Sequence, residues 1–110
     1  MHLDFLYRES QIKMEKALTE SEIQEELTRL SGWQYSEGRI VKTFQFKHFA
    51  EAMSFIVRLS YECERRDHHP EIYNLYNEVT IGLNTHSAGD SVTARDIALA
   101  RDIEHFAWRS

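Results

Sequence analysis

The chain is poor in the residues that build disulfide frameworks and long irregular loops. It has one cysteine, one proline and four glycines in 110 residues. Cys63 has no partner for a disulfide within the chain, which excludes a disulfide-stapled scaffold and suits a reducing compartment. So few glycines and prolines also exclude extended low-complexity segments. The length predicts one compact domain, because domains usually have about 100–150 residues.

Positive charge and long apolar runs are lacking as well. Thirteen Lys and Arg against 18 Asp and Glu give a formal net charge of −5. A nucleic-acid-binding surface needs a basic patch, so this balance argues against direct contact with nucleic acid. No apolar run approaches the ~20 residues of a membrane-spanning helix, and the N-terminal residues carry charges too early for a secretory signal. These absences predict a cytoplasmic protein that binds neither membrane nor nucleic acid directly.

Apolar residues, in contrast, are abundant and periodic. They make up 42% of the chain and include six Phe, five Tyr and two Trp, enough for a core. A capping box at Thr19–Glu22 followed by Ile23, Leu27 and Leu30 predicts a helix over 19–31. A broader apolar stripe from 48 to 63 predicts a second helix that must end before Pro70. Thr93 is a typical N-cap for a third helix over 94–108.

Two hairpins separate these helices. Glu37-Gly38 is typical of a tight turn, and Ile40, Phe44 and Phe46 alternate after it, which predicts a hairpin over 33–46. Segments 72–76 and 79–83 predict two further strands joined at Asn77. The order αββαββα predicts an α+β fold in which three helices pack on one face of a four-stranded antiparallel sheet. We expect residues 1–18 to be an N-terminal extension and residues 19–110 to form the domain.

Histidines gather at two places in this pattern, at His68-His69-Pro70 and at Thr85-His86. The pKa of imidazole is near neutrality, so three converging imidazoles would make a proton-transfer site. The doublet alone is as typical of a polar corner between helix and strand, but Glu64, Pro70 and His86 in register favour a site. Structural zinc usually has four ligands at C-x₂-C or H-x₃-H spacings. Adjacent histidines and a lone cysteine do not match those spacings, and we expect no metal.

The spacing of Glu64, His68-His69-Pro70, His86 and Asp96, with the segment HHPEIYNLYNEVTIGLNTH, resembles the pterin-4a-carbinolamine dehydratases. The resemblance covers roughly residues 19–108 and includes the αββαββα order. It implies a hydro-lyase that converts 4a-hydroxytetrahydropterin to quinonoid dihydropterin and water, in tetrahydrobiopterin recycling, without a cofactor. It implies roles for nine residues: catalytic His68, His69 and His86; substrate-binding Pro70, Thr85, Ser87 and Ala88; supporting Glu64 and Asp96.

Imidazoles suit this reaction. Loss of the C4a hydroxyl requires one proton delivered to oxygen and one removed from N5, which an imidazolium and a neutral imidazole can do. We expect His68 and His86 to be the acid/base pair and His69 to bind and orient the substrate. Which of them gives the proton stays open, because coupled histidines can share a titration.

The acidic residues have structural interpretations as well. Asp96 is the third residue of a Thr-capped helix, where a carboxylate is favoured without any catalytic role, and the two interpretations have equal weight. Asp90 is an alternative loop acid. A carboxylate near a helix C-terminus is unfavourable, so Glu64 is either a solvated last-turn residue or has an Arg or His partner. Aromatic residues at strand spacing, and Cys63, are typical of a core.

A second class of function is a non-catalytic module on the same fold. The resemblance includes dimerisation cofactors of a homeodomain transcription factor and assembly factors of a carbon-fixing enzyme. Three histidines favour the dehydratase, because a scaffold has no chemical need for them. Relatives form dimers or tetramers, and an open sheet edge or an apolar helix face can pair with its copy. We therefore expect a homodimer or homotetramer.

Overall fold

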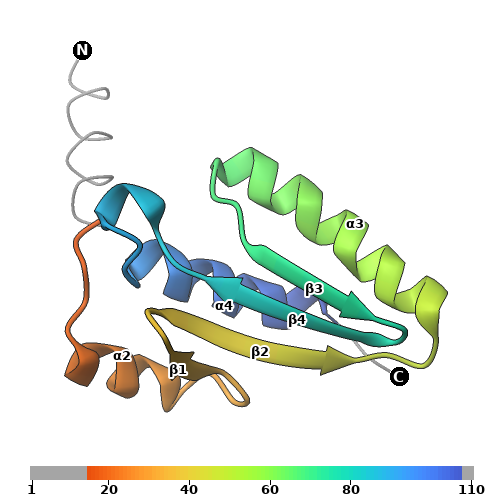
Figure 1. Cartoon of the computed structure of the whole chain (residues 1–110), viewed down its shortest axis with the longest axis horizontal. Helices are drawn as coiled ribbons and strands as arrows, with labels where there is room; N and C mark the ends of the chain where they lie inside the picture. Colours follow the sequence, from red (N-terminus) through yellow and green to blue (C-terminus); the bar gives the residue numbers. More distant parts are fainter. Residues whose placement is uncertain (1–14, 108–110) are drawn as a thin grey trace.

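The computed structural model describes residues 15–107 and confirms the αββαββα order and the α+β class (Figure 1). Its elements are α2 (Glu20–Leu27), β1 (Gln34–Ser36), β2 (Arg39–Gln45), α3 (Phe49–Arg66), β3 (Glu71–Leu75), β4 (Glu78–Leu83), the 3₁₀ turn η1 (His86–Ala88) and α4 (Ala94–Phe106). Among these residues, no helix is long and apolar enough to cross a membrane.

The four strands form one antiparallel sheet in the order β1-β2-β4-β3. The β1–β2 turn holds Glu37 at φ 52° and Gly38 at φ 80°. Two left-handed residues are the turn geometry that matches the twist of the flanking strands. At the centre of the sheet, Ile40 of β2 lies opposite Leu83 of β4, and Phe44 lies opposite Val79. Strand β3 occupies one edge of the sheet.

The core lies on one face of this sheet. Alternate residues of the two central strands are buried there, as the predicted phase requires: Ile40, Phe44, Val79, Ile81 and Leu83. Buried side chains of all three helices belong to the same cluster, among them Ile23 of α2, Ala52, Phe55 and Leu59 of α3, and Leu99, Ala100 and Ile103 of α4. The ring of Phe55 lies 5.2 Å from that of Phe44 and 5.1 Å from that of Phe46. One core therefore joins the helices to the sheet.

Helix boundaries differ from the prediction at two places. Helix α2 ends at Leu27 and not near residue 31. The N–H groups of Thr28, Arg29 and Leu30 donate to carbonyls three residues back, at 3.3, 3.1 and 3.1 Å, so the chain tightens into turns and leaves the α-helical pattern. Gly32, at φ 87°, supplies the left-handed residue further on. Helix α4 ends at Phe106, two residues before the predicted end.

Candidate active site

The C-terminal end of α3 places His68 against the core. Asp67 adopts a left-handed conformation at φ 50°, and the N–H of His68 donates to the carbonyl of Cys63 at 3.0 Å. These are features of the Schellman motif, which turns the chain back across its own helix. His68 is consequently only 6% exposed. The helix was predicted to end before Pro70, which its last residue, Arg66, confirms, and the left-handed Asp67 is the local cause of that end.

Asp96 is the buried acceptor for this imidazole. Its side chain is fully buried, and Oδ1 lies 2.6 Å from Nε2 of His68. Oδ2 accepts from the backbone N–H of Thr93 and from the hydroxyl of Thr85, both at 2.8 Å. Asp96 thus completes the capping box of α4 and also contacts His68. The two interpretations of Asp96 are compatible, because its two oxygens serve different partners.

The other two histidines also pair with carboxylates, at the surface. Nε2 of His69 lies 2.7 Å from Oε1 of Glu64, and the imidazole is 61% exposed. The expected partner of Glu64 is therefore a histidine. Nδ1 of His86 lies 2.8 Å from Oδ1 of Asp90, and the side chain of His86 is 96% exposed. Asp90 contacts a site histidine as a loop acid, while Asp96 serves the buried one.

One cleft of about 340 Å³ brings all three histidines together. Five of the nine predicted site residues line it, and Glu64, Pro70, Ala88 and Asp96 do not. Four further residues line the cleft without having been predicted. Its lining consists of Glu15, Asp67, His68, His69, Asn84, Thr85, His86, Ser87 and Arg95.

Arg95 is the most informative of the missed residues. Nη2 donates to the carbonyls of Arg66 and Asp67 at 3.1 and 3.0 Å, and Nη1 donates to Oε1 of Glu15 at 2.9 Å. Arg95 therefore fastens the end of α3 just before the histidine doublet. The sequence feature that could have identified Arg95 is its position in the first turn of a helix, where the helix dipole disfavours a cation. A cation at such a position needs a hydrogen-bond or charge partner nearby, but the sequence position does not predict which residue provides it.

Cys63 takes no part in the cleft. It is buried beneath the end of α3, and burial raises the pKa of its thiol to about 11. A thiol that stays protonated is a poor nucleophile and a poor metal ligand. Among residues 15–107, no group of three His, Cys, Asp or Glu side chains has an arrangement that could hold a metal ion.

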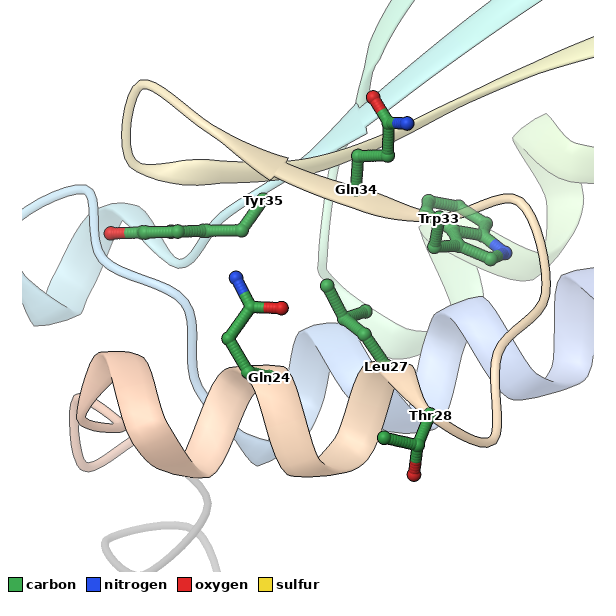
Figure 2. Close-up of a pocket in the computed structure, with 6 residues that line it drawn as sticks. All are labelled: Gln24, Leu27, Thr28, Trp33, Gln34 and Tyr35. Atoms are coloured by element: carbon green, nitrogen blue, oxygen red, sulfur yellow. The ribbon is translucent and has the colours of Figure 1, made fainter.

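A second hollow, of about 390 Å³, lies between α2 and β1. Figure 2 shows Gln24 and Leu27 extending from α2 toward β1, while Thr28 points away from the strand. The remaining lining residues are Trp33, Gln34 and Tyr35. Among the described residues, no imidazole and no carboxylate line this hollow.

A family model described as pterin 4 alpha carbinolamine dehydratase matches residues 16–106. The chain belongs to this family. The match includes all nine predicted site residues and ends at Phe106, the last residue of α4.

Relatives and solved structures agree. A protein of Opitutus terrae, provisionally named a pterin-4-alpha-carbinolamine dehydratase, is 46% identical over 95 residues, which are 86% of this chain and 98% of the relative. A Rhodopseudomonas palustris protein with the same provisional name is 47% identical over 96 residues, or 86% and 94% of the two chains. A crystal structure from Brucella melitensis, described as a transcriptional coactivator/pterin dehydratase, has 43% identity and a TM-score of 0.79, covering 84% of this chain and all of that one.

A fourth protein shares the fold at a greater distance. It is described as a pterin dehydratase-like protein and a RuBisCO assembly factor in the alpha-carboxysome. Its identity is 24% and its TM-score 0.56, over 71% of this chain and 89% of that chain. At this identity the likeness concerns the fold alone.

Proposed function

We propose that this chain is a dehydratase that releases water from 4a-hydroxytetrahydropterin by histidine acid/base catalysis, as a step in tetrahydrobiopterin recycling. The observation that carries the proposal is the cleft in which three imidazoles meet, each beside its own carboxylate. General acids and bases need their partners held in place and a pKa near the working pH, which imidazole provides. Membership of the family supplies the substrate class. The reducing cytoplasm is the compartment that suits a chain with one free thiol.

His68 is the base in this proposal. A carboxylate only accepts hydrogen bonds, so Nε2 of His68 carries the proton that faces Asp96. In the neutral ring this leaves the lone pair on Nδ1, and that atom takes the proton from N5 of the pterin. The buried carboxylate stabilises the positive charge that then forms on the ring. Asp96 thus orients the imidazole and supports it during the reaction.

His86 is the acid. It protonates the departing C4a hydroxyl, the C4a–O bond breaks, and the N5=C4a bond forms as N5 loses its proton to His68. The products are water and quinonoid dihydropterin, with no net gain or loss of electrons. The side chain of His86 is open to solvent, so it can be recharged from water after each turnover. His69, paired with Glu64, binds and orients the substrate, with contacts from Thr85 and Ser87 in the cleft and from Pro70 and Ala88 beside it.

The test is the rate of dehydration of 4a-hydroxytetrahydropterin by the purified chain. His86→Ala should lower kcat by about 100-fold or more, the usual share of one acid/base group. Pterin binding should weaken far less, because the imidazole acts in the transition state. His105→Ala is the matched control, since His105 is exposed and lies outside the cleft. An unchanged kcat in His86→Ala would remove His86 from the mechanism.

The runner-up is a binding or assembly module, because a distant neighbour with this fold is described as a RuBisCO assembly factor. Fold alone does not decide function. The paired histidines favour the dehydratase, since assembly requires none of them. A wild-type protein that gives no acceleration over buffer would favour the module.

We also infer that the chain forms a homo-oligomer. Strand β3 is an edge of the sheet, and it exposes Ile72, Tyr73 and Leu75. Unpaired backbone groups beside exposed apolar side chains are a template for pairing with another strand. Helix α3 exposes Phe49, Val57 and Tyr61, a second apolar surface. A second copy of the chain would cover either surface.

A further inference from the structure

One carboxylate that lines the cleft comes from outside the segment that the family model matches. The family match begins at residue 16, yet Glu15 lines the cleft together with the three histidines. The segment that carries Glu15 is held in place, because the N–H of Leu18 donates to the carbonyl of Val92 at 2.9 Å. Leu18 also packs against the core. Glu15 is therefore a positioned part of the cleft wall.

The partner of Glu15 is the single strong cation of the cleft. Among the described residues that line it, Arg95 is the only arginine or lysine. Oε1 of Glu15 lies 2.9 Å from Nη1 of Arg95, and the two side chains are 35% and 16% exposed. A partly buried ion pair is screened by water less than an exposed one. The pair therefore controls the charge that a ligand meets at this wall.

Arg95 does not depend on Glu15 for its position. Its Nη2 donates to the carbonyls of Arg66 and Asp67 independently of Glu15. Loss of the Glu15 carboxylate would leave the guanidinium at the cleft with its charge uncompensated and Nη1 free to donate. Such a guanidinium is a preferred binder of carboxylate and phosphate groups.

We propose that Glu15 is a specificity-determining residue that makes the cleft select pterins with an uncharged substituent and reject those with an anionic one. This inference rests on the proposed function, because it takes the cleft to be a pterin site. Glu15 acts in two ways: it occupies the donor that an anion would use, and its own charge repels the anion. Rejection by a like charge is a common device of specificity.

The experiment compares the binding of biopterin, which has an uncharged side chain, with that of pterin-6-carboxylate, by fluorescence titration at low ionic strength. Glu15→Gln keeps the length of the side chain and removes its charge. It should tighten binding of pterin-6-carboxylate by about three- to fivefold, which corresponds to the upper range measured for exposed ion pairs, and leave the affinity for biopterin within about twofold. Raising the salt concentration should reduce the gain, because screening weakens the interaction between charges.

Glu20→Gln is the matched control. This substitution removes one negative charge five residues after Glu15, from an exposed side chain that does not line the cleft. It should change neither the dissociation constant of biopterin nor that of pterin-6-carboxylate. If Glu15→Gln leaves the ratio of the two constants unchanged while biopterin still binds, the inference is wrong and the proposed function stands. If Glu20→Gln shifts the ratio equally, the effect is one of net charge and the inference is also wrong. A wild-type protein that binds neither pterin overturns both.

Discussion

The buried pair of His68 and Asp96 allows one substitution to test the role of Asp96 in catalysis while it largely preserves the fold. In Asp96→Asn the amide fills the same volume and keeps one oxygen. That oxygen should stay where Oδ2 is now, because the backbone N–H of Thr93 can only donate and requires an acceptor there. The amide NH₂ then faces Nε2 of His68. Two donors cannot face each other, so the ring must move its proton to Nδ1.

The expected magnitudes differ for stability and for catalysis. Asp96→Asn exchanges a charge-assisted hydrogen bond for a neutral one, which costs about 1–2 kcal/mol. Asp96→Ala, in contrast, leaves the N–H of Thr93 and the ring N–H of His68 without an acceptor in the core. At about 1–3 kcal/mol for each of these two buried groups and about 1 kcal/mol for the lost cap, the cost is about 3–7 kcal/mol. That is a large part of the stability of a small domain, which is about 5–15 kcal/mol.

Three measurements test this reasoning. Chemical denaturation gives the free energy of unfolding, which should separate Asp96→Asn from Asp96→Ala by at least about 1 kcal/mol. Steady-state dehydration should show kcat reduced by about 100-fold in Asp96→Asn, because the base now presents a proton to the substrate. Nitrogen NMR of the His68 ring should report the exchanged tautomer. A variant that keeps the wild-type kcat, or whose His68 is still protonated at Nε2, would refute the assignment of His68 as an oriented base.

Three further outcomes follow from the structure. Burial raises the pKa of the Cys63 thiol to about 11. A thiol-specific disulfide reagent at neutral pH should therefore label Cys63 only as fast as the chain unfolds, and rapid labelling of the native protein would contradict its burial. The hydrogen bond from Arg65 is the largest of several causes that lower the pKa of Glu62 in the folded state. The contribution of Glu62 to stability is therefore present above the ordinary pKa of a glutamate and is lost as the pH falls through the lowered pKa. The difference in unfolding free energy between wild type and Glu62→Gln should shrink on acidification, and a difference that is constant or grows would be inconsistent with this pairing. Leu75→Lys places a charge on the exposed edge strand and should shift the elution of the purified protein toward the monomer, whereas a wild-type chain already monomeric at micromolar concentration would contradict the proposed oligomer.

Local signals were sufficient for most of the fold. The Thr93 capping box and the Glu37-Gly38 turn are formed by residues adjacent in sequence, and their geometry follows from side-chain and backbone preferences alone. The alternation of Ile40, Phe44 and their neighbours on β4 followed from the period of a strand with one buried face. The end of α2 could not be predicted in this way, because its apolar stripe continues to the buried Leu30 through turns that are no longer α-helical.

The sequence by itself determined the order of the elements, the phase of the buried faces and the residues of the histidine motif, because each depends on neighbours within a few positions. The partner of the buried His68 was decided only by the tertiary structure. Glu64 and Asp90 lie within five residues of His69 and His86, but the carboxylate that faces His68 depends on where α3 and α4 come together, and Asp96 meets His68 across 28 residues. Glu15 meets Arg95 across 80 residues. No local periodicity encodes contacts at such separations, so the electrostatics of the cleft emerge only when the helices pack on the sheet.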